Sequence, residues 1–519
     1  MNAGHKTLIG IAMVLAVTAP LFAGGDAEPG AVDGDVYRFS FATGPWDVGQ
    51  GRIDVAEQPN HPWFQYVESQ VGAAPLTQSW EWEGSDGYLQ GLRLALAGGE
   101  PMEVLMPWSP VFSQELIDAG LVVPLDDLIP QYEHIAAFYP DEIWDSIRTQ
   151  QGGRIYYIPE PVAPLAGRAG FIRRDWLERV GLDVPTTREE LLTVYRAFRD
   201  QDANGNGDRN DEIPVSGRQL FRWFDDLFLM HGVVMFEGHP QWSWNEAEGF
   251  FESHQVSDQM LAAVQFINLL YSEGLMDIAM PAQPNADWTA KIADDRVGHY
   301  FHLISEIDSK SAFAFEPEND ATGLRHWTVM PHPPIVEGVG RVPYYYPNVG
   351  SPRFLITTNA RDPEAIMAWL DWSSSPEGSA FANLGVPGVD WQRDADGEIQ
   401  VINQVPAVNF KYAFNLGPTP NDIVARSPMG ALKVEILETV VPAFAPTPNM
   451  LMPASVYDGY ADFVPSSATM YREMIGQMIT GAVAPTQQNW DAYRRRWYQA
   501  GGQVVTDRAT QWYREFFGR

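Results

Sequence analysis

Alternating apolar and polar side chains predict a first strand over residues 36–43, where the sequence is VYRFSFAT. Apolar residues then recur at helical spacing over residues 87–97, and the sequence GGEP follows. A short apolar strand over residues 102–108 leads into a helix that begins at Ser109. This order of strand, helix, strand and helix indicates an α/β lobe, in which ligand-facing loops lie at the carboxyl ends of the strands.

The strongest helix signal covers residues 185–201, PTTREELLTVYRAFRDQ. Thr187 and Glu190 have the spacing of a capping box, in which each side chain accepts a hydrogen bond from the other residue's backbone N–H. Apolar residues within the segment fall on one helical stripe. Before it, residues 169–182 predict a strand that runs into a helix, and residues 153–164 predict a strand broken by prolines.

The later part of the chain predicts helices over residues 220–233 and 257–275, joined by an aromatic-rich connection over residues 236–250. Strand-like and helix-like segments alternate over residues 326–378, and the chain from Ala468 onward is mostly helical. A chain of 519 residues exceeds what one core usually supports, so two or more lobes are expected. Because neither an internal repeat nor a long low-complexity linker occurs, the lobes should be intertwined.

The amino terminus has the layout of a secretory signal peptide, with His5 and Lys6 before an apolar run over residues 8–17 and small residues up to Gly25. An uncleaved membrane anchor is the alternative, but the apolar run is shorter than the roughly 20 residues that a spanning helix needs. We therefore expect residues 1–25 to be a signal peptide and the mature protein to be periplasmic or secreted. The absence of cysteine excludes disulfides, thiolate metal sites and lipid attachment through an amino-terminal cysteine.

The formal net charge of −33 narrows the range of partners. Such a surface repels nucleic acid and anionic lipid, so we expect no nucleic-acid partner. Aromatic residues make up 12% of the chain. Most of them should lie in the core, but aromatic faces also stack on the apolar faces of sugar rings, which makes a sugar a candidate ligand.

Residues 202–214, DANGNGDRNDEIP, place side-chain oxygens at alternate positions. The first half matches the calcium-loop pattern D-x-[DN]-x-[DN]-G-x5-E, but the last position holds Ile213 in place of glutamate. Because Pro214 follows at once, no second helix of a helix–loop–helix switch is expected. We expect bound calcium in preference to a solvated Asn-Gly turn or to magnesium, which prefers a few carboxylates with phosphate. The candidate metal ligands are Asp202, Asn204, Asn206, Asp208, Asn210, Asp211 and Glu212.

Sequence motifs for catalysis are absent. The chain has no GxSxG, HExxH or GxxxxGK[ST] motif, and its ten histidines show no ligand spacing. A glycosidase needs only two carboxylates brought together by folding, so a secreted polysaccharide hydrolase or lyase with structural calcium remains an alternative to a non-enzymatic binding protein. Adjacent acids such as Asp225 and Asp226 are expected on a solvated face.

Aromatic residues beside predicted loops are better candidates for a sugar site. They offer stacking faces near polar side chains that can hydrogen-bond hydroxyl groups or carboxylates. The candidate ligand-binding residues are Trp46, Trp108, Glu160, Arg168, Arg218, Trp223, Tyr346 and Trp391.

The chain from GRIYYIPEPVAP through RRDWLERVGLDVPTT to the DANGNGDRNDEIP loop resembles the extracellular solute-binding proteins of carbohydrate ABC importers. The resemblance is to the subgroup that includes alginate-binding and related oligosaccharide-binding proteins. Further similarity lies in GLVVPLDDLI (120–129), NLGVPGVDW (383–391) and MITGAVAPTQQNWDAYRRRWYQAGG (478–502), so it spans almost the whole mature chain.

This resemblance implies a two-lobed α/β periplasmic binding protein fold with crossing hinge segments and a helical carboxyl-terminal region. It further implies a monomer that closes over an oligosaccharide and docks on the permease subunits of an ABC transporter. The lobes are predicted to comprise residues 26–150 with 305–372, and residues 151–304 with 373–519. The second lobe would carry the calcium loop at residues 202–212, which is similar to a structural calcium site away from the sugar.

The sequence departs from the family pattern in places. One residue is inserted before the Asp-Glu pair relative to the commoner DxNGNGxxDEIP form, so either Asn210 or Asp211 fills the next coordination position. Many members have a lipid-attached cysteine after the signal, and many have glutamate where this chain has Pro387. A calcium-responsive adhesion or signalling module is a third interpretation, disfavoured because the loop lacks a second helix.

Overall fold

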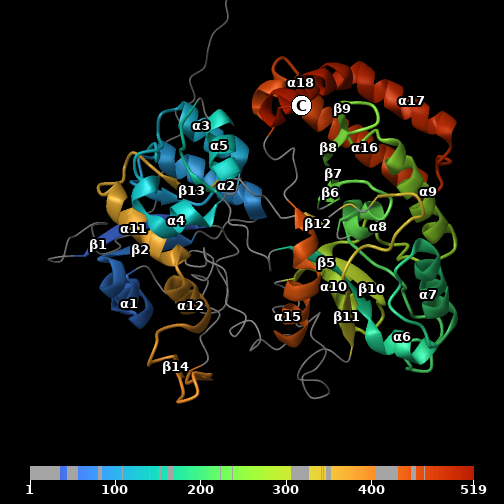
Figure 1. Ribbon diagram of the computed structural model, residues 1–519, viewed down its shortest axis with the longest axis horizontal. Coiled ribbons are helices and arrows are strands. Elements are labelled where there is room, and N and C mark those ends of the chain that lie inside the picture. The colour runs from blue at the N-terminus through green and yellow to red at the C-terminus, as the bar shows by residue number, and fades with distance from the viewer. Residues whose placement is uncertain are drawn as a thin grey trace, which may run out of the picture.

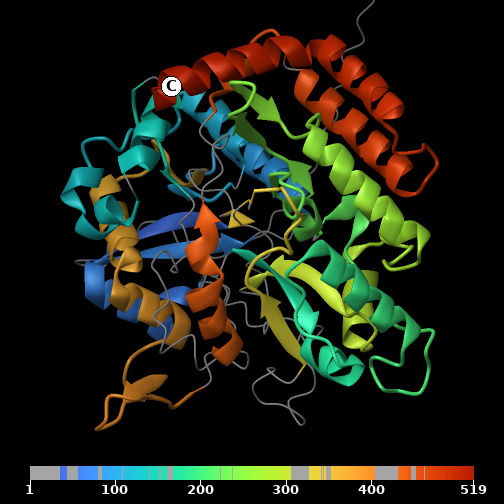
Figure 2. The same cartoon turned by 45° about the vertical axis from the view of Figure 1, so that its right-hand side comes forward.

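Two α/β lobes lie side by side in the computed structural model (Figures 1 and 2). It describes residues 36–43, 56–79, 84–107, 109–139, 141–150, 153–159, 167–222, 224–236, 238–304, 326–340, 342, 344–345, 352–403, 430–445, 452–460 and 462–518. The expected signal peptide, residues 1–25, lies outside this part of the chain. Within the described residues, no helix combines the length and the apolar character needed to cross a membrane.

Lobe 1 is built on a five-stranded sheet with the order β2-β1-β3-β13-β4. The strand predicted over residues 36–43 is confirmed as β1 (Tyr37–Thr43). It runs parallel to β2 (Ala73–Ser79) and to β3 (Val104–Leu105). β13 (Pro352–Ile356) is antiparallel to β3 and to β4 (Ile158–Pro159).

Helices connect and cover the strands of this sheet. α1 (Pro62–Val71) joins β1 to β2, and α2 (Gly84–Ala97) joins β2 to β3, which gives the parallel strands their crossover connections. α3 (Pro110–Asp118) has Ser109, the predicted start of the helix, as its N-cap, and the Ser109 hydroxyl accepts a hydrogen bond from the backbone N–H of Phe112. The remaining helices of this part are α4 (Glu133–Phe138) and α5 (Asp141–Gln150), with short 3-10 turns at Gln58–Asn60 and Ile129–Gln131.

A late segment returns to lobe 1. Trp369 of α11 (Pro363–Ser374) is fully buried, and its ring lies 5.3 Å from Phe39 and 5.6 Å from Phe41 of β1 between centroids. α12 (Pro376–Leu384) packs on α11, and the hairpin of β14 (Trp391–Arg393) and β15 (Ile399–Val401) follows. The first lobe therefore continues past residue 372, where its predicted boundary lies.

Lobe 2 has a three-stranded sheet with β5 (Arg168–Arg173) in the centre. β10 (His299–Leu303) and β11 (Trp327–Met330) flank it, both antiparallel. β11 lies in the stretch that the sequence assigns to lobe 1, and its burial against β5 shows that it belongs to lobe 2. A smaller parallel pair joins β12 (Tyr344–Tyr345) to β16 (Phe444–Ala445).

Helices of lobe 2 surround this sheet. α6 (Arg174–Val180) follows β5 directly, and α7 (Arg188–Asp200) has both hydrogen bonds of the predicted Thr187–Glu190 capping box. α9 (Asp258–Ser272) confirms the helix predicted at residues 257–275. The other helices are α8 (Asp225–Leu229), α10 (Asn285–Ala293), α15 (Gly430–Thr439), α16 (Phe463–Ile479), α17 (Gln487–Trp497) and α18 (Gln503–Phe517), with 3-10 turns at Gln219–Phe221, Val441–Ala443 and Ala454–Tyr457.

The carboxyl-terminal helices lie along one edge of lobe 2 (Figures 1 and 2), and a π-helical turn at Tyr498–Gly502 joins α17 to α18. This confirms the predicted helical carboxyl-terminal region. The aromatic-rich stretch expected as a plain connection forms two hairpins. They consist of β6 (Met235–Phe236) with β7 (His239–Pro240), and β8 (Trp242–Asn245) with β9 (Phe250–Ser253).

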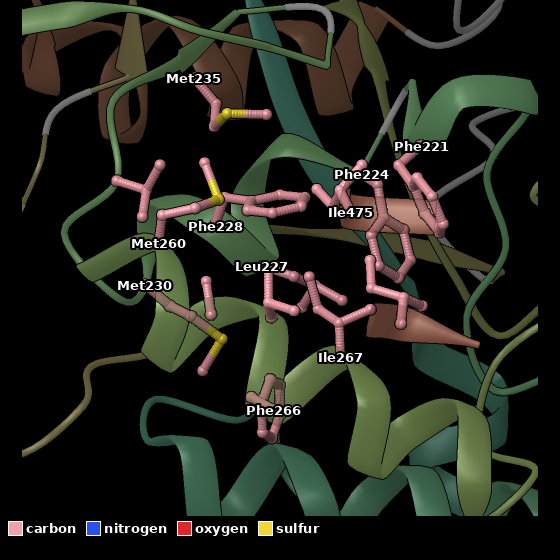
Figure 3. Packing of buried hydrophobic residues seen from close by; sticks show 14 of the residues in the cluster. Phe221, Phe224, Leu227, Phe228, Met230, Met235, Met260, Phe266, Ile267 and Ile475 are labelled. Carbon is pink, nitrogen blue, oxygen red and sulfur yellow. The ribbon is translucent and has the colours of Figure 1, made fainter. Parts of the chain in front are cut away.

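The prediction that Asp225 and Asp226 lie on a solvated face is wrong. Both side chains are 1% exposed, because the long helix expected over residues 220–233 is only the five-residue α8 and it lies inside the core. Figure 3 shows its Leu227 and Phe228 packed among residues of α9 and α16, including Ile475. The backbone N–H of Gly238 donates a hydrogen bond to Asp225 Oδ1, which offsets the cost of burying that carboxylate.

The chain passes from one lobe to the other between β4 and β5, between β12 and β13, and between β15 and α15. Each lobe is therefore assembled from separate parts of the sequence, as the prediction of intertwined lobes requires. The packing confirms the predicted two-lobed α/β class with crossing segments.

Candidate functional site

The loop of residues 202–213 in lobe 2 directs its side-chain oxygens inward through a series of local turns. Asn204 Oδ1 accepts a hydrogen bond from the N–H of Asn206, Asn206 Oδ1 from Asp208, and Asp208 Oδ1 from Asn210, at 2.7–3.0 Å. Asp202 Oδ2 accepts from the N–H of Gly207 at 3.0 Å. The alternation of oxygen-bearing residues in the sequence thus produces a regular loop rather than an open turn.

Glycine is required twice in this loop. Gly205 and Gly207 have φ angles of +78° and +94°, which residues with a side chain rarely adopt. At Gly205 an added Cβ would also lie 2.8 Å from the guanidinium carbon of Arg179, whose Nη1 donates to the carbonyl of Ala203. The two glycines therefore allow the loop to curl against α6.

Two carboxylate oxygens of the loop are buried without a hydrogen-bond donor, Oδ1 of Asp202 and Oε2 of Glu212. Burial raises the pKa of Glu212, and the nearby Asp211 carboxylate adds to the effect by like-charge repulsion. Leaving charged oxygens buried without a partner is costly, and a hard cation would remove that cost. The donor set of this loop therefore fits a calcium ion, although no group of three or more acids or histidines in the described residues has metal-binding geometry.

The hydrogen bonds of the loop also distinguish between Asn210 and Asp211 as the next candidate metal ligand. Both oxygens of Asp211 lie inside the loop, where they accept hydrogen bonds from the side-chain amides of Asn204 at 3.3 Å and Asn206 at 2.8 Å. The amide of Asn210 instead donates to Asp208 Oδ1 at 3.1 Å, and Asn210 is exposed. This arrangement favours Asp211 over Asn210 as the residue that faces the loop centre.

The loop is attached to the segment that leads into β10. Ile213 N–H donates to the carbonyl of Arg296 at 2.7 Å, and Arg296 Nε donates to the carbonyl of Asp211 at 3.2 Å. Asn204 Nδ2 reaches the carbonyl of Asp295, while the Asp295 carboxylate pairs with the buried Arg173 at the end of β5. The loop thus links the end of α7 to the start of β10.

Of the eight predicted ligand-binding residues, three can be placed. Arg168 is the first residue of β5, directly after a crossing between the lobes, and its buried guanidinium carbon lies 4.3 Å from the ring centroid of Phe236. This cation–π contact fixes the orientation of the side chain. The other five, Trp46, Trp108, Glu160, Trp223 and Tyr346, lie outside the described residues.

Arg218 and Trp391 lie apart from each other. Arg218 is half-buried in lobe 2, where Nη1 donates to Asn285 Oδ1 at 3.3 Å. Trp391 is in the β14–β15 hairpin of lobe 1, and its Nε1 donates to the carbonyl of Gly385 at 3.0 Å. The predicted residues that can be placed therefore come from both lobes and do not form one cluster.

A buried polar group in lobe 2 has no signal in the sequence. His299 Nε2 lies 2.8 Å from Asp226 Oδ2, and His299 Nδ1 is hydrogen-bonded to the hydroxyl of Tyr195. Burial raises the pKa of Tyr195 well above its ordinary value, so the hydroxyl stays protonated. Because all three side chains are at most 1% exposed, no substrate can reach them and their role is structural.

The architecture and the loop together define a class of two-lobed protein in which the chain crosses repeatedly between α/β lobes. The model of the family "Bacterial extracellular solute-binding protein" matches residues 77–380. The chain belongs to this family. That assignment favours the binding interpretation over a hydrolase or lyase.

A curated relative agrees with this family assignment. The fructooligosaccharide ABC transporter substrate-binding protein FusA of Streptococcus pneumoniae is 27% identical over 304 residues, which cover 53% of this chain and 51% of FusA. The match therefore spans about half the length of that curated relative.

Solved structures share the fold over a longer stretch. A solute-binding protein from Bifidobacterium longum subsp. infantis has a TM-score of 0.69 at 19% identity, with 94% of this chain and 99% of that chain covered. An EF-hand mutant of S. pneumoniae FusA in complex with fructo-nystose has a TM-score of 0.67 at 19% identity, with 93% and 99% covered. At these identities the similarity shows the fold, and it confirms the two-lobed binding-protein architecture.

Proposed function

We propose that this protein captures an oligosaccharide outside the cytoplasm and delivers it to the permease subunits of an ABC transporter. The observation that carries the proposal is the pair of separately cored lobes joined by repeated crossings, in a chain of the solute-binding family. Lobes of this kind can close over a ligand by rotation about the crossing segments. FusA, a relative, is a fructooligosaccharide-binding protein, which supports a sugar ligand.

The ligand would lie between the lobes, where residues next to the crossings are within reach. We expect Arg168 to contact the ligand because it begins β5 directly after a crossing, and its guanidinium could donate hydrogen bonds to ring hydroxyl groups or to a uronate. Aromatic stacking would come from Trp46, Trp108, Trp223, Tyr346 and Trp391, and further hydrogen bonds from Glu160 and Arg218. Binding and release require no bond chemistry, so we expect no catalytic activity.

We also propose that the loop of residues 202–213 holds a structural calcium ion. Asp202, Asn204, Asn206, Asp211 and Glu212 would supply side-chain oxygens, and Asp208 its carbonyl. The ion would neutralise the buried carboxylates and hold the loop against the start of β10. Since the described contacts of the loop are with lobe 2, its effect is expected on stability rather than on sugar selection.

Export by the amino-terminal signal peptide would place the mature chain in the periplasm or outside the cell as a freely diffusing monomer. Titration of the mature protein with a broad panel of neutral and acidic oligosaccharides, followed by tryptophan fluorescence and calorimetry, tests the function. Saturable binding of one sugar class supports the proposal. Release of new reducing ends from a polysaccharide substrate would instead support the hydrolase or lyase alternative.

A further inference from the structure

A groove of about 680 Å³ lies along α18, and we refer to it as the α18 groove. The helix itself runs along an edge of lobe 2 (Figures 1 and 2). Its volume falls within the roughly 300–1,000 Å³ of ligand pockets. All of its described lining residues belong to lobe 2. Its lining includes Phe250, Tyr498, Gln503, Asp507, Gln511, Arg514 and Glu515.

One wall of the groove is a row of polar side chains on α18. Gln503, Asp507, Gln511 and Glu515 follow one another at intervals of four residues, so they lie on the same face of the helix. Gln503 Nε2 donates to Asp507 Oδ1 at 2.9 Å, and Gln511 Nε2 donates to Glu515 Oε1 at 2.8 Å. Each hydrogen bond holds two side chains in place and uses only one of the carboxylate oxygens. The row therefore presents oriented acceptors to the groove.

The aromatic part of the lining comes from outside the helix. Phe250 begins β9, and Tyr498 lies in the π-helical turn before α18. Both residues line the groove and are half-buried. The position of β9 is fixed because the N–H of Phe251 donates to Thr510 Oγ1 of α18 at 3.0 Å. A flat apolar face beside oriented hydrogen-bonding groups is suited to a sugar ring, which has one apolar face and a rim of hydroxyl groups.

The charges of the groove select against anions. Asp507 and Glu515 contribute two carboxylates, whereas the Arg514 guanidinium donates to the carbonyl of Gly249 at 2.7 Å and lies near the ring of Trp244. An acidic ligand would therefore meet two like charges and one cation that is already engaged, on a chain with a net charge of −33.

We propose that the α18 groove is a second carbohydrate site that binds neutral sugar units of an oligosaccharide. The acceptor row hydrogen-bonds ring hydroxyl groups, and Phe250 and Tyr498 provide the stacking faces. The site goes beyond the proposed function and does not rest on it, because lobe 1 contributes nothing to the lining described above.

Equilibrium dialysis of the mature protein at millimolar concentrations of maltotriose, raffinose and kestose tests this site. The variant Gln503→Ala/Asp507→Ala removes half of the acceptor row from exposed positions, where alanine preserves the helix. The matched control is Gln487→Ala/Asp491→Ala, which removes the same kind of Gln–Asp pair, at 2.9 Å, from α17. Trigalacturonate and spermidine serve as anionic and cationic probes.

The expected result is that the groove variant binds one equivalent fewer of a neutral sugar per chain, or binds it at least tenfold more weakly, while the α17 variant binds as the wild type does. If the space between the lobes binds no sugar, the wild type should bind a single equivalent and the groove variant none. Unchanged binding of all three neutral sugars in the groove variant overturns the proposal. So does preferential loss of trigalacturonate or spermidine binding in that variant.

Discussion

Asp226 Oδ2 lies 2.8 Å from Nε2 of His299, and both side chains are buried in the core of lobe 2. The pair joins α8 to β10, and Tyr195 extends it to α7. Gly170 of β5 lies directly beside it, since an added Cβ there would be 2.9 Å from Asp226 Oδ2 and 2.6 Å from Met330 Cε. α7, α8 and β10 are therefore connected through one polar group beside the central strand.

Removal of one partner of the Asp226–His299 pair should destabilise the protein. Asp226→Ala leaves His299 without its carboxylate inside the core, and we expect the free energy of unfolding to fall by about 3–5 kcal/mol. The exposed Asp183 provides a control, because Asp183→Ala should change stability by less than about 0.5 kcal/mol. Urea denaturation followed by circular dichroism measures both. Equal stabilities of the two variants would show that the buried pair does not stabilise lobe 2.

Stability should fall in mild acid because of two buried histidines. Burial lowers the pKa of His231 and of His254 from 6.5 to about 4. The unfolded chain takes up these protons below pH 6.5, whereas the folded chain does so only near pH 4. The contribution of the two neutral histidines to the free energy of unfolding is therefore complete above pH 6.5. It is lost as the pH falls towards 4, by about 3 kcal/mol per histidine.

Denaturation curves of the wild type and of His254→Gln, recorded at pH 7 and pH 4.5, measure this effect. The variant should lose less stability between the two pH values than the wild type, whatever its stability at pH 7. His134 is exposed, so His134→Gln should retain the pH dependence of the wild type. An identical pH dependence in all three proteins would contradict the assignment to buried histidines.

The space around two glycines predicts that Gly298→Ala and Gly476→Ala change the stability of the protein in opposite directions. At Gly298 an added Cβ would lie 2.5 Å from Phe198 Cδ2 and 2.9 Å from Trp176 Cζ3, so Gly298→Ala should destabilise by about 1–3 kcal/mol. At Gly476, inside α16, the same change meets nothing within 4 Å, and alanine should stabilise by about 0.5–1 kcal/mol through helix propensity. Thermal denaturation compares the two. A shift of Tm in the same direction for both variants would refute the packing argument.

Local sequence signals predicted the structure well where the interactions are themselves local. The Thr187–Glu190 capping box and the turns of the 202–213 loop depend on residues two to five positions apart. The lobe to which Phe381 belongs depends instead on its contact with Trp63, more than 300 residues away, so the predicted boundary at residue 372 differs from the packing.

The same reasoning applies to the acidic pair in α8. Two adjacent aspartates normally indicate a solvated face, but the partner that allows Asp226 to be buried is His299, which is distant in the sequence. The α18 groove is another such case, because its row on α18 has a helical period but Phe250 comes from a different element. Sequence patterns detect the polar row on α18 and do not detect that Phe250 packs beside it.

Chelation tests the proposed calcium site. Removal of calcium should lower the Tm, and readdition at about 100 times the Kd should restore about 2.7 kcal/mol, while the choice of sugar stays the same. Asp211→Asn should lose most of the calcium-dependent stabilisation, whereas Asn210→Ala should retain it, because only Asp211 faces the loop centre. Loss of sugar binding on chelation without loss of stability would place the ion in the ligand site instead.

The most direct test of the central claim is calorimetric titration of the mature protein with a panel of neutral and acidic oligosaccharides, combined with a reducing-end assay on the same samples. A solute-binding protein should give saturable heat with at least one sugar class and no increase in reducing ends. Absence of binding across the panel, or turnover of any of these sugars, would contradict the account.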